Sequence, residues 1–211
     1  MSGLGLSLDA ARIEAMAGDL ATSGYAVAAL ALDPHLTAAL RLEAEALASD
    51  PLAIDAGVGR GTDHSRVQKI RQSRIKWLDG STSDQSKFLA AAEEIRIALN
   101  RRLLLGLFEF EAQLALYEPG GFYARHVDSF TGARNRMVSM ITYLTPDWQA
   151  TDGGELAIWR DRNDTADAPA AIIQPAAGTL VLMLSEDIPH EVRVAHRRRA
   201  SIAGWWRVRV A

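Results

Sequence analysis

The sequence predicts an α+β protein in which helices precede a jelly-roll barrel or sandwich of β-strands. Three observations support this fold class. Apolar residues recur at helical spacing before Gly106 and with a period of two after it. The second half contains many short strand-like runs separated by turn residues, which is typical of jelly rolls. The 211 residues are 48% hydrophobic, which suits one globular domain with a sizeable core.

Three helices are predicted in the first half, each from its own start signal. Ser7 is expected to cap a helix over residues 8–22, and Asp33 followed by Pro34 to start a second that ends near residue 50. Thr82 and Gln85 have the spacing of a capping box before a third helix that runs to about residue 103. Short strands are expected over residues 25–32, 67–70 and 75–78, with an irregular, mobile loop over residues 52–65.

Residues 108–117 show the clearest strand alternation. One face carries only apolar residues from Phe108 to Leu116, and the other runs from Glu109 through Gln113 to Tyr117. We expect the apolar face to pack on the helices and the polar face to line a cleft. Further strands are expected over residues 137–145, 155–159, 171–174, 179–185, 191–194 and 200–210.

These patterns predict one domain over residues 1–211. Residues 1–106 are expected to be mainly helical support with short strands and a mobile loop, and residues 107–211 to form a jelly-roll core that carries the site. The net charge of -3 predicts no general attraction to nucleic acid or anionic membranes. The absence of cysteine excludes thiolate chemistry and fits a reducing compartment. With no signal-peptide pattern and no membrane-spanning apolar run, we expect a cytoplasmic protein.

A candidate metal site combines two histidines and one carboxylate. His126 and Asp128 are two residues apart, so on an extended segment both side chains point to the same face. His190 is the best third ligand, and together they form the facial triad preferred by non-haem iron(II) oxygenases, although the same ligands accept manganese. The alternative is a surface His and Asp with no ligand role. His35 and His196 have no partner pattern and are expected at the surface, as is His64.

Arg199 is the candidate anion clamp, nine residues after His190. Its planar fork suits a carboxylate, and its neighbours on the same strand face are small. The alternative is a solvated basic edge or a nucleic-acid patch, and for Arg197 and Arg198 solvation is expected. Tyr143 is expected to be a core tyrosine whose hydroxyl needs a partner, which a cosubstrate carboxylate would supply. The triad and Arg199 together predict an iron(II)- and 2-oxoglutarate-dependent oxygenase.

The segments that carry these residues resemble the prolyl 4-hydroxylase branch of the iron(II)/2-oxoglutarate dioxygenases. Within that branch the sequence is most similar to the oxygen-sensing prolyl hydroxylases and their bacterial relatives. The likeness is strong over residues 108–210 and looser in the first half, through residues 58–60 and 75–78. The matching segments are residues 116–128, 136–144, 153–156, 189–192 and 199–205.

The resemblance implies a double-stranded β-helix fold buttressed by the N-terminal helices, with iron on the triad. It implies that Arg199 and Tyr143 hold the distal carboxylate of 2-oxoglutarate, and that Tyr117 and Trp205 line its pocket. No catalytic residue beyond the metal ligands is implied. Nucleic-acid demethylases of the superfamily carry a second arginine at the place of Trp205, so this difference argues against that function.

For the substrate, the resemblance implies a prolyl residue in a protein, with a translation elongation factor as a plausible partner and no nucleic acid or membrane. Arg136 matches a position near the substrate entrance, and Val58 and Arg60 lie in a loop that matches a mobile lid. The cofactor set is Fe(II), 2-oxoglutarate and dioxygen, with ascorbate as a supporting reductant and succinate and CO2 as products. Two alternatives stay open: a hydroxylase of free amino acids or other small molecules, and a non-catalytic metal-binding jelly-roll sensor.

Overall fold

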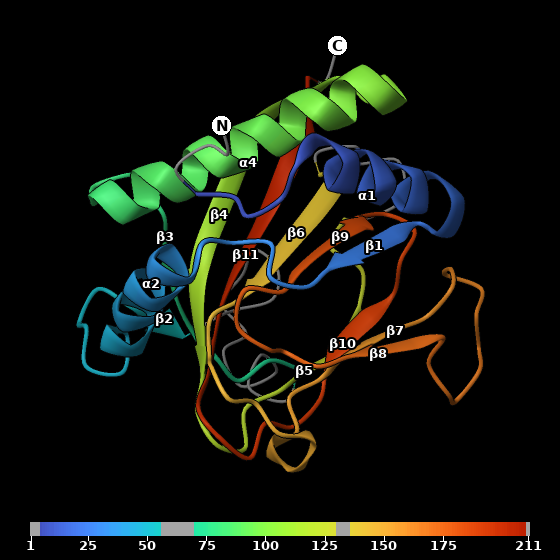
Figure 1. Cartoon of the computed structure of the whole chain (residues 1–211). Coiled ribbons are helices and arrows are strands. Elements are labelled where there is room, and N and C mark those ends of the chain that lie inside the picture. Colours follow the sequence, from blue (N-terminus) through green and yellow to red (C-terminus); the bar gives the residue numbers. More distant parts are fainter. Residues whose placement is uncertain (1–4, 56–69, 130–135, 210–211) are drawn as a thin grey trace.

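Two antiparallel β-sheets form the centre of the computed structural model, which describes residues 5–55, 70–129 and 136–209 (Figure 1). Within these residues the larger sheet has the strand order β1-β9-β6-β11-β4-β3-β2 and the smaller the order β5-β10-β7-β8. The strands are β1 Tyr25–Ala28, β2 Ile54–Asp55, β3 Arg74–Trp77, β4 Leu107–Tyr117, β5 Tyr123–His126, β6 Val138–Tyr143, β7 Leu156–Ile158, β8 Ala171–Ile173, β9 Leu180–Leu184, β10 His190–Val192 and β11 Arg199–Val208.

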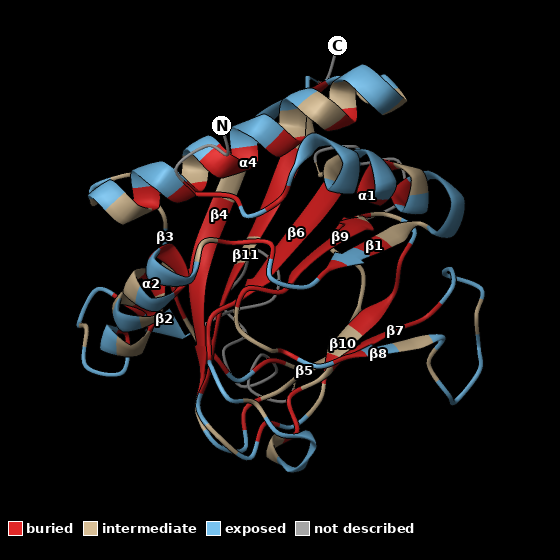
Figure 2. Cartoon of the chain, in the orientation of Figure 1, coloured by how far each residue is buried: buried red, intermediate tan, exposed pale blue. Residues whose placement is uncertain are grey.

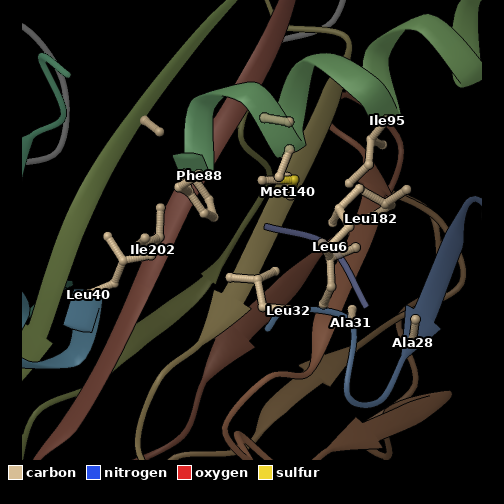
Figure 3. Packing of buried hydrophobic residues seen from close by; sticks show 14 of the residues in the cluster. Leu6, Ala28, Ala31, Leu32, Leu40, Phe88, Ile95, Met140, Leu182 and Ile202 are labelled. Carbon is tan, nitrogen blue, oxygen red and sulfur yellow. The ribbon is translucent and has the colours of Figure 1, made fainter. Parts of the chain in front are cut away.

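Helices cover the outer face of the larger sheet. They are α1 Ala10–Ser23, α2 Pro34–Ala46 and α4 Ser83–Leu103, and a short 3-10 turn, η1, spans Ala150–Asp152. Figure 2 shows their exposed sides turned outward and the sheet beneath them buried. Phe88 and Ile95 of α4 point towards the strands, where Met140 and Leu182 meet them (Figure 3). The predicted α+β fold, a jelly roll supported by helices, is confirmed.

A second apolar cluster lies between the two sheets. Ile141 and Val181 contribute to it from the larger sheet, and Leu156, Ile158 and Val192 from the smaller. The larger sheet is therefore covered on both faces, by helices on one side and by the smaller sheet on the other. In a sheet that is covered on both faces, almost every side chain packs into one core or the other. All six residues of β6 are accordingly buried.

The structure contains the three predicted helices, but not every predicted N-cap residue is the one observed. Asp33 accepts hydrogen bonds from the backbone N–H groups of His35 and Leu36 and caps α2, as predicted. The prediction of Ser7 as the first cap was wrong, because the carboxylate of Asp9 accepts from the N–H of Arg12 and α1 begins two residues later than expected. Both are local caps of the ordinary kind, in which a side-chain oxygen satisfies a free N–H of the first turn.

The capping box before α4 is only half formed. Thr82 accepts a hydrogen bond from the N–H of Gln85, as predicted. The amide of Gln85 does not return the bond; its oxygen accepts from the N–H groups of Asp79 and Gly80, and its nitrogen donates to Glu43. A tertiary partner on α2 thus redirects a side chain that local spacing alone would turn to the cap.

The alternation of β4 holds from Ala112 to Tyr117 but fails at its start. Phe108 was expected on the helix-facing side, yet it is 54% exposed while Leu107 is buried. In the pairing with β11, Arg207 faces Glu109 and Val208 faces Leu107, so Phe108 is the extra residue of a β-bulge. A bulge reverses the side to which the following residues point.

Strands of the first half are built into the larger sheet. β1 pairs with β9, and β3 pairs with β4. The expected strand over residues 25–32 is shorter, because Leu30 has a φ of 52° in a turn. β2 lies where a loop was predicted, and the strand predicted over 67–70 falls largely outside the described residues. No helix within the described ranges is long and apolar enough to cross a bilayer.

Candidate active site

The three predicted metal ligands converge at one end of the smaller sheet. His126 ends β5 and His190 begins β10, and the two residues are register partners. Asp128 follows β5, with its Oδ1 3.5 Å from Nε2 of His126 and its Oδ2 3.7 Å from Nε2 of His190. One ligand atom from each residue lies within 4.8 Å of the other two, which is close enough for one metal ion.

Backbone carbonyls orient both imidazoles. Nδ1 of His126 lies 2.8 Å from the carbonyl oxygen of Ala124, and Nδ1 of His190 lies 3.0 Å from that of Ile188. A carbonyl only accepts hydrogen bonds, so each Nδ1 carries the proton and each Nε2 keeps its lone pair for a metal. The ring of Tyr123 stacks on that of His126 with centroids 3.5 Å apart, which further fixes the imidazole plane.

The ionisation states of the triad suit a metal. Burial raises the pKa of Asp128, but the nearby imidazoles of His190 and His126 and a hydrogen bond from Ser139 outweigh it and hold this pKa below its usual range. Burial and the nearby His126 lower the pKa of His190 to about 4, although Asp128 opposes the shift. At neutral pH the site therefore offers a carboxylate and a neutral buried imidazole, the forms that bind a divalent ion. This donor set fits iron(II).

A pocket extends from the triad between the two sheets. Its wall on the larger sheet consists of alternate residues of three adjacent strands, including Gln113 and Tyr117 of β4, Ser139 of β6 and Arg199 and Trp205 of β11. These strands are held in register, with Arg199 opposite Tyr117 and Trp205 opposite Ser139. The polar face of β4 therefore lines a cleft from Gln113 to Tyr117, as the sequence predicted, but Glu109 and Glu111 of the same face are not among the lining residues.

Arg199 is a buried cation without a described counter-ion. Its side chain is almost fully buried, and Nη1 donates to the hydroxyl of Ser201 at 3.2 Å. Its guanidinium lies 5.0 Å from the ring of Tyr117 and 4.9 Å from that of Tyr143. In the part of the chain that the structure describes, no carboxylate lies within ion-pair distance of Arg199 and its Nε has no partner. A buried unpaired charge is unfavourable, so the site fits an anionic ligand.

The neighbouring Tyr143 supports the same conclusion. Its hydroxyl is buried and has no partner among the described residues. Burial raises its pKa to about 12 although Arg199 opposes the shift, so the phenol keeps a proton that it can donate. A carboxylate placed between Arg199 and Tyr143 would satisfy both groups, and the far end of 2-oxoglutarate is such a carboxylate.

The other arginines behave as the sequence suggested. Arg197 pairs with Asp152 and Arg198 pairs with Glu118, and their side chains are 41% and 47% exposed. The basic cluster before β11 is therefore a solvated edge. Of these three neighbouring arginines, Arg199 is the one that lines the pocket.

Arg136 lies beside the pocket. Its Nε and Nη2 donate to Oε1 of Glu111 at 2.8 and 2.7 Å, and its guanidinium lies 3.8 Å from the ring centroid of Trp205, itself a lining residue. Its predicted role at the substrate entrance stays a prediction. Val58 and Arg60, the predicted lid residues, lie outside the described residues.

Three polar or charged pocket residues were missed from the sequence: Arg71, Tyr123 and Ser139. Ser139 shares a strand face with Tyr143, so the alternation could have placed its side chain towards the pocket, although not beside Asp128. Arg71 gave no such signal. It joins the site through a bridge to Tyr123, over whose ring its guanidinium lies at 4.9 Å.

Comparison with known proteins agrees with this geometry. The sequence model of the 2OG-Fe(II) oxygenase superfamily matches residues 112–207. A prolyl-4-hydroxylase from Pseudomonas putida is 38% identical, with a TM-score of 0.82 over 94% of this chain and 100% of that chain.

Two more distant structures share the fold. A prolyl hydroxylase from Trichoplax adhaerens, in complex with a hypoxia inducible factor oxygen degradation domain peptide fragment, is 23% identical, with a TM-score of 0.81 over 94% of this chain and 90% of that chain. The epimerase SnoN from nogalamycin biosynthesis is 18% identical, with a TM-score of 0.66 over 95% of this chain and 84% of that chain.

The family match covers the strands that carry Arg199 and all three triad residues, and the similarity to the bacterial enzyme covers the whole of that enzyme. The site offers the ligands that iron(II) needs and a buried cation for the second carboxylate of 2-oxoglutarate. The chain therefore belongs to the 2OG-Fe(II) oxygenase superfamily and is a 2-oxoglutarate-dependent dioxygenase.

Proposed function

We propose that this dioxygenase hydroxylates a prolyl residue in a protein substrate and releases succinate and CO2. The observation that carries the oxygenase chemistry is the buried Arg199, unpaired among the described residues, in the same pocket as His126, Asp128 and His190. The prolyl target is supported by the 38% identity to the Pseudomonas putida prolyl-4-hydroxylase. The peptide held by the Trichoplax adhaerens enzyme supports a protein rather than a free amino acid.

Two groups of residues act in this site: one binds the metal and the other orients 2-oxoglutarate. His126, Asp128 and His190 bind the metal and leave its other positions open. Arg199 and Tyr143 hold the distal carboxylate of 2-oxoglutarate, which fixes the direction of the cosubstrate. Tyr117 lines its path. Bound iron(II), with 2-oxoglutarate and dioxygen, supplies the oxidising power for C–H hydroxylation, and the protein supplies position and exclusion of water.

A protein substrate also suits the surface beside the pocket. Trp77 is 45% exposed, and its ring lies 6.2 Å from that of Trp205, which lines the pocket. Arg136 covers part of Trp205. Exposed aromatic rings next to a charged pair are typical of surfaces that bind peptides. An elongation factor with an exposed proline is the protein to test first, in the cytoplasm where we expect the enzyme.

The test is conversion of 2-oxoglutarate to succinate by the iron-loaded protein under air, with peptides that contain proline or alanine at the same place. We expect succinate to rise with the prolyl peptide, which gains one oxygen by mass, and to be lost with Arg199→Ala. Oxygen found only in a free amino acid would favour the small-molecule hydroxylase instead. Metal binding without any 2-oxoglutarate binding would contradict both.

Asp128→Ala tests the triad separately. We expect metal binding and turnover to be lost while the metal-free protein keeps its circular dichroism spectrum, because Asp128 lies in a loop after β5 and not in either apolar cluster. Full turnover in this variant would remove Asp128 from the metal site.

A further inference from the structure

Two buried serines form a hydrogen-bonded chain that ends on the carboxylate of Asp128. Oγ of Ser139 donates to Oδ2 of Asp128 at 2.6 Å, and the hydroxyl oxygens of Ser139 and Ser185 lie 2.9 Å apart. Both serines are 1% exposed. Ser139 is in β6 and Ser185 follows β9, so the chain links the larger sheet to the metal-binding loop beside the smaller one.

The direction of the hydrogen bonds follows from counting protons. Asp128 is ionised and only accepts, so the single hydroxyl proton of Ser139 goes to Oδ2. The bond between the two serines must then be donated by Ser185. A hydroxyl that accepts one bond while it donates another is polarised and donates more strongly. Ser185 thus strengthens the bond that Ser139 makes to the carboxylate.

The backbone holds the two ends of this chain together. The N–H of Ser129, next to Asp128, donates to the carbonyl of Ser185 at 3.1 Å, and the N–H of Ser185 donates to the carbonyl of Met137 at 3.0 Å. Arg162 adds a bond to the carbonyl of Ser129 at 2.7 Å and one to that of Glu186. The loop that carries Asp128 is therefore fastened to the end of β9 at several points.

We propose that Ser139 is a positioning residue that fixes the rotation of the Asp128 carboxylate for metal binding, and that Ser185 acts through Ser139. Each carboxylate oxygen faces a ligand imidazole, Oδ1 at 3.5 Å from Nε2 of His126 and Oδ2 at 3.7 Å from Nε2 of His190. Because Ser139 already engages Oδ2, Oδ1 is the oxygen left for the metal. A single carboxylate oxygen on the metal leaves more positions for cosubstrate and dioxygen than two would. This inference rests on the proposed metal site.

The same strand supplies a matched control. Thr142 is also fully buried in β6, but its hydroxyl has no partner among the described residues and its neighbours in the alternation, Met140 and Val138, pack on the helix side. Removing the hydroxyl of Thr142 therefore removes a buried polar group of similar size from the same strand without touching the triad.

The experiment titrates the metal-free protein with Co(II) by calorimetry and follows the visible bands of the bound ion, which report coordination geometry. The wild type must bind and Asp128→Ala must not, which tests the metal site itself. We expect Ser139→Ala to weaken binding roughly 10- to 100-fold and to change the bands, as loss of such supporting bonds does elsewhere. Ser139→Thr, which keeps a hydroxyl, should restore both, and Thr142→Val should bind like the wild type.

The double variant tests the order of the chain. Ser185→Ala should weaken Co(II) binding by a smaller factor than Ser139→Ala, and should add nothing in the Ser139→Ala background, because its effect passes through Ser139. Three results would overturn the proposal while the wild type still binds: Co(II) affinity of Ser139→Ala within two-fold of the wild type, no restoration by Ser139→Thr, or independent effects of the two serines. Thermal unfolding of each metal-free variant checks that the proteins titrated are folded.

Discussion

The two faces of the larger sheet are equally buried but chemically opposite. On β4, β6 and β11, Leu114, Met140 and Ile202 point to the helices and form a continuous apolar core. Their sequence neighbours Gln113 and Ser139, with others of the same register, point to the pocket. Burial therefore does not mark the functional face. What marks it is a buried cation, Arg199, that lines the pocket beside the metal ligands and has no ion-pair partner among the described residues.

Substitution of Arg199, on the pocket face, should have the largest effect on activity. Arg199→Met keeps much of the side-chain volume but removes the charge that pairs with the cosubstrate, so we expect kcat/KM for 2-oxoglutarate to fall roughly 10³-fold, a loss typical for one partner of a buried charge pair. The stability of the unliganded protein should not fall, because a buried charge without a counter-ion is removed. Arg197→Met is the exposed control, and an unchanged KM in Arg199→Met would place the clamp elsewhere.

On the helix face the effect should be on stability and not on binding. Phe88 of α4 is fully buried, and Phe88→Ala should lower the free energy of unfolding by about 3–5 kcal/mol through the cavity it leaves. The affinity of the folded variant for 2-oxoglutarate should stay within a few-fold of the wild type. Denaturant unfolding and calorimetry measure the two quantities. Phe108→Ala, at the exposed bulge, should cost less than about 1 kcal/mol.

The pocket face should also make the metal-free protein sensitive to acid. The pKa of His190 is lowered by burial to about 4 from an ordinary 6.5, so the unfolded chain binds a proton before the folded one does. Stability is therefore full above pH 6.5 and is lost as the pH falls towards 4, by on the order of 2–3 kcal/mol. Thermal unfolding between these pH values measures the loss. His190→Gln should reduce it and His196→Gln should not; equal losses in both would exclude His190 as the cause.

Substitution of Thr142 should change stability only slightly, and in the opposite direction to Phe88→Ala. Its buried hydroxyl lacks a partner among the described residues, so Thr142→Val should raise the free energy of unfolding by about 1 kcal/mol. Denaturant unfolding with Thr179→Val as the comparison measures it. A loss of stability would mean that the hydroxyl is hydrogen-bonded in solution.

The sequence alternation predicted much of the difference between the helix face and the pocket face of the larger sheet. The period of two placed Ala112 and Leu114 on one face of β4 and Gln113 and Tyr117 on the other, as found. Polar type and spacing picked out His126, Asp128 and His190, and the structure brings them together. These residues were predictable because a strand fixes the directions of its side chains locally.

The rest depended on contacts between segments far apart in the chain. The bulge at Phe108 is set by the register with β11, and the side chain of Gln85 is redirected by Glu43. Ser139 is an ordinary strand residue until Asp128 and Ser185 are placed beside it. No local sequence pattern predicts these contacts. A serine that supports a metal ligand therefore cannot be identified from the sequence, even when the ligand itself can.

The site is shared between the two sheets, and this has a consequence for the choice of cosubstrate. His126 and His190 belong to the smaller sheet and Arg199 to the larger one, so the spacing of the two sheets sets the span from metal to guanidinium. That spacing is held by the apolar residues packed between the sheets. With Arg199 in its proposed role, we expect a 2-oxo diacid one methylene shorter or longer than 2-oxoglutarate to contact the metal or Arg199 but not both.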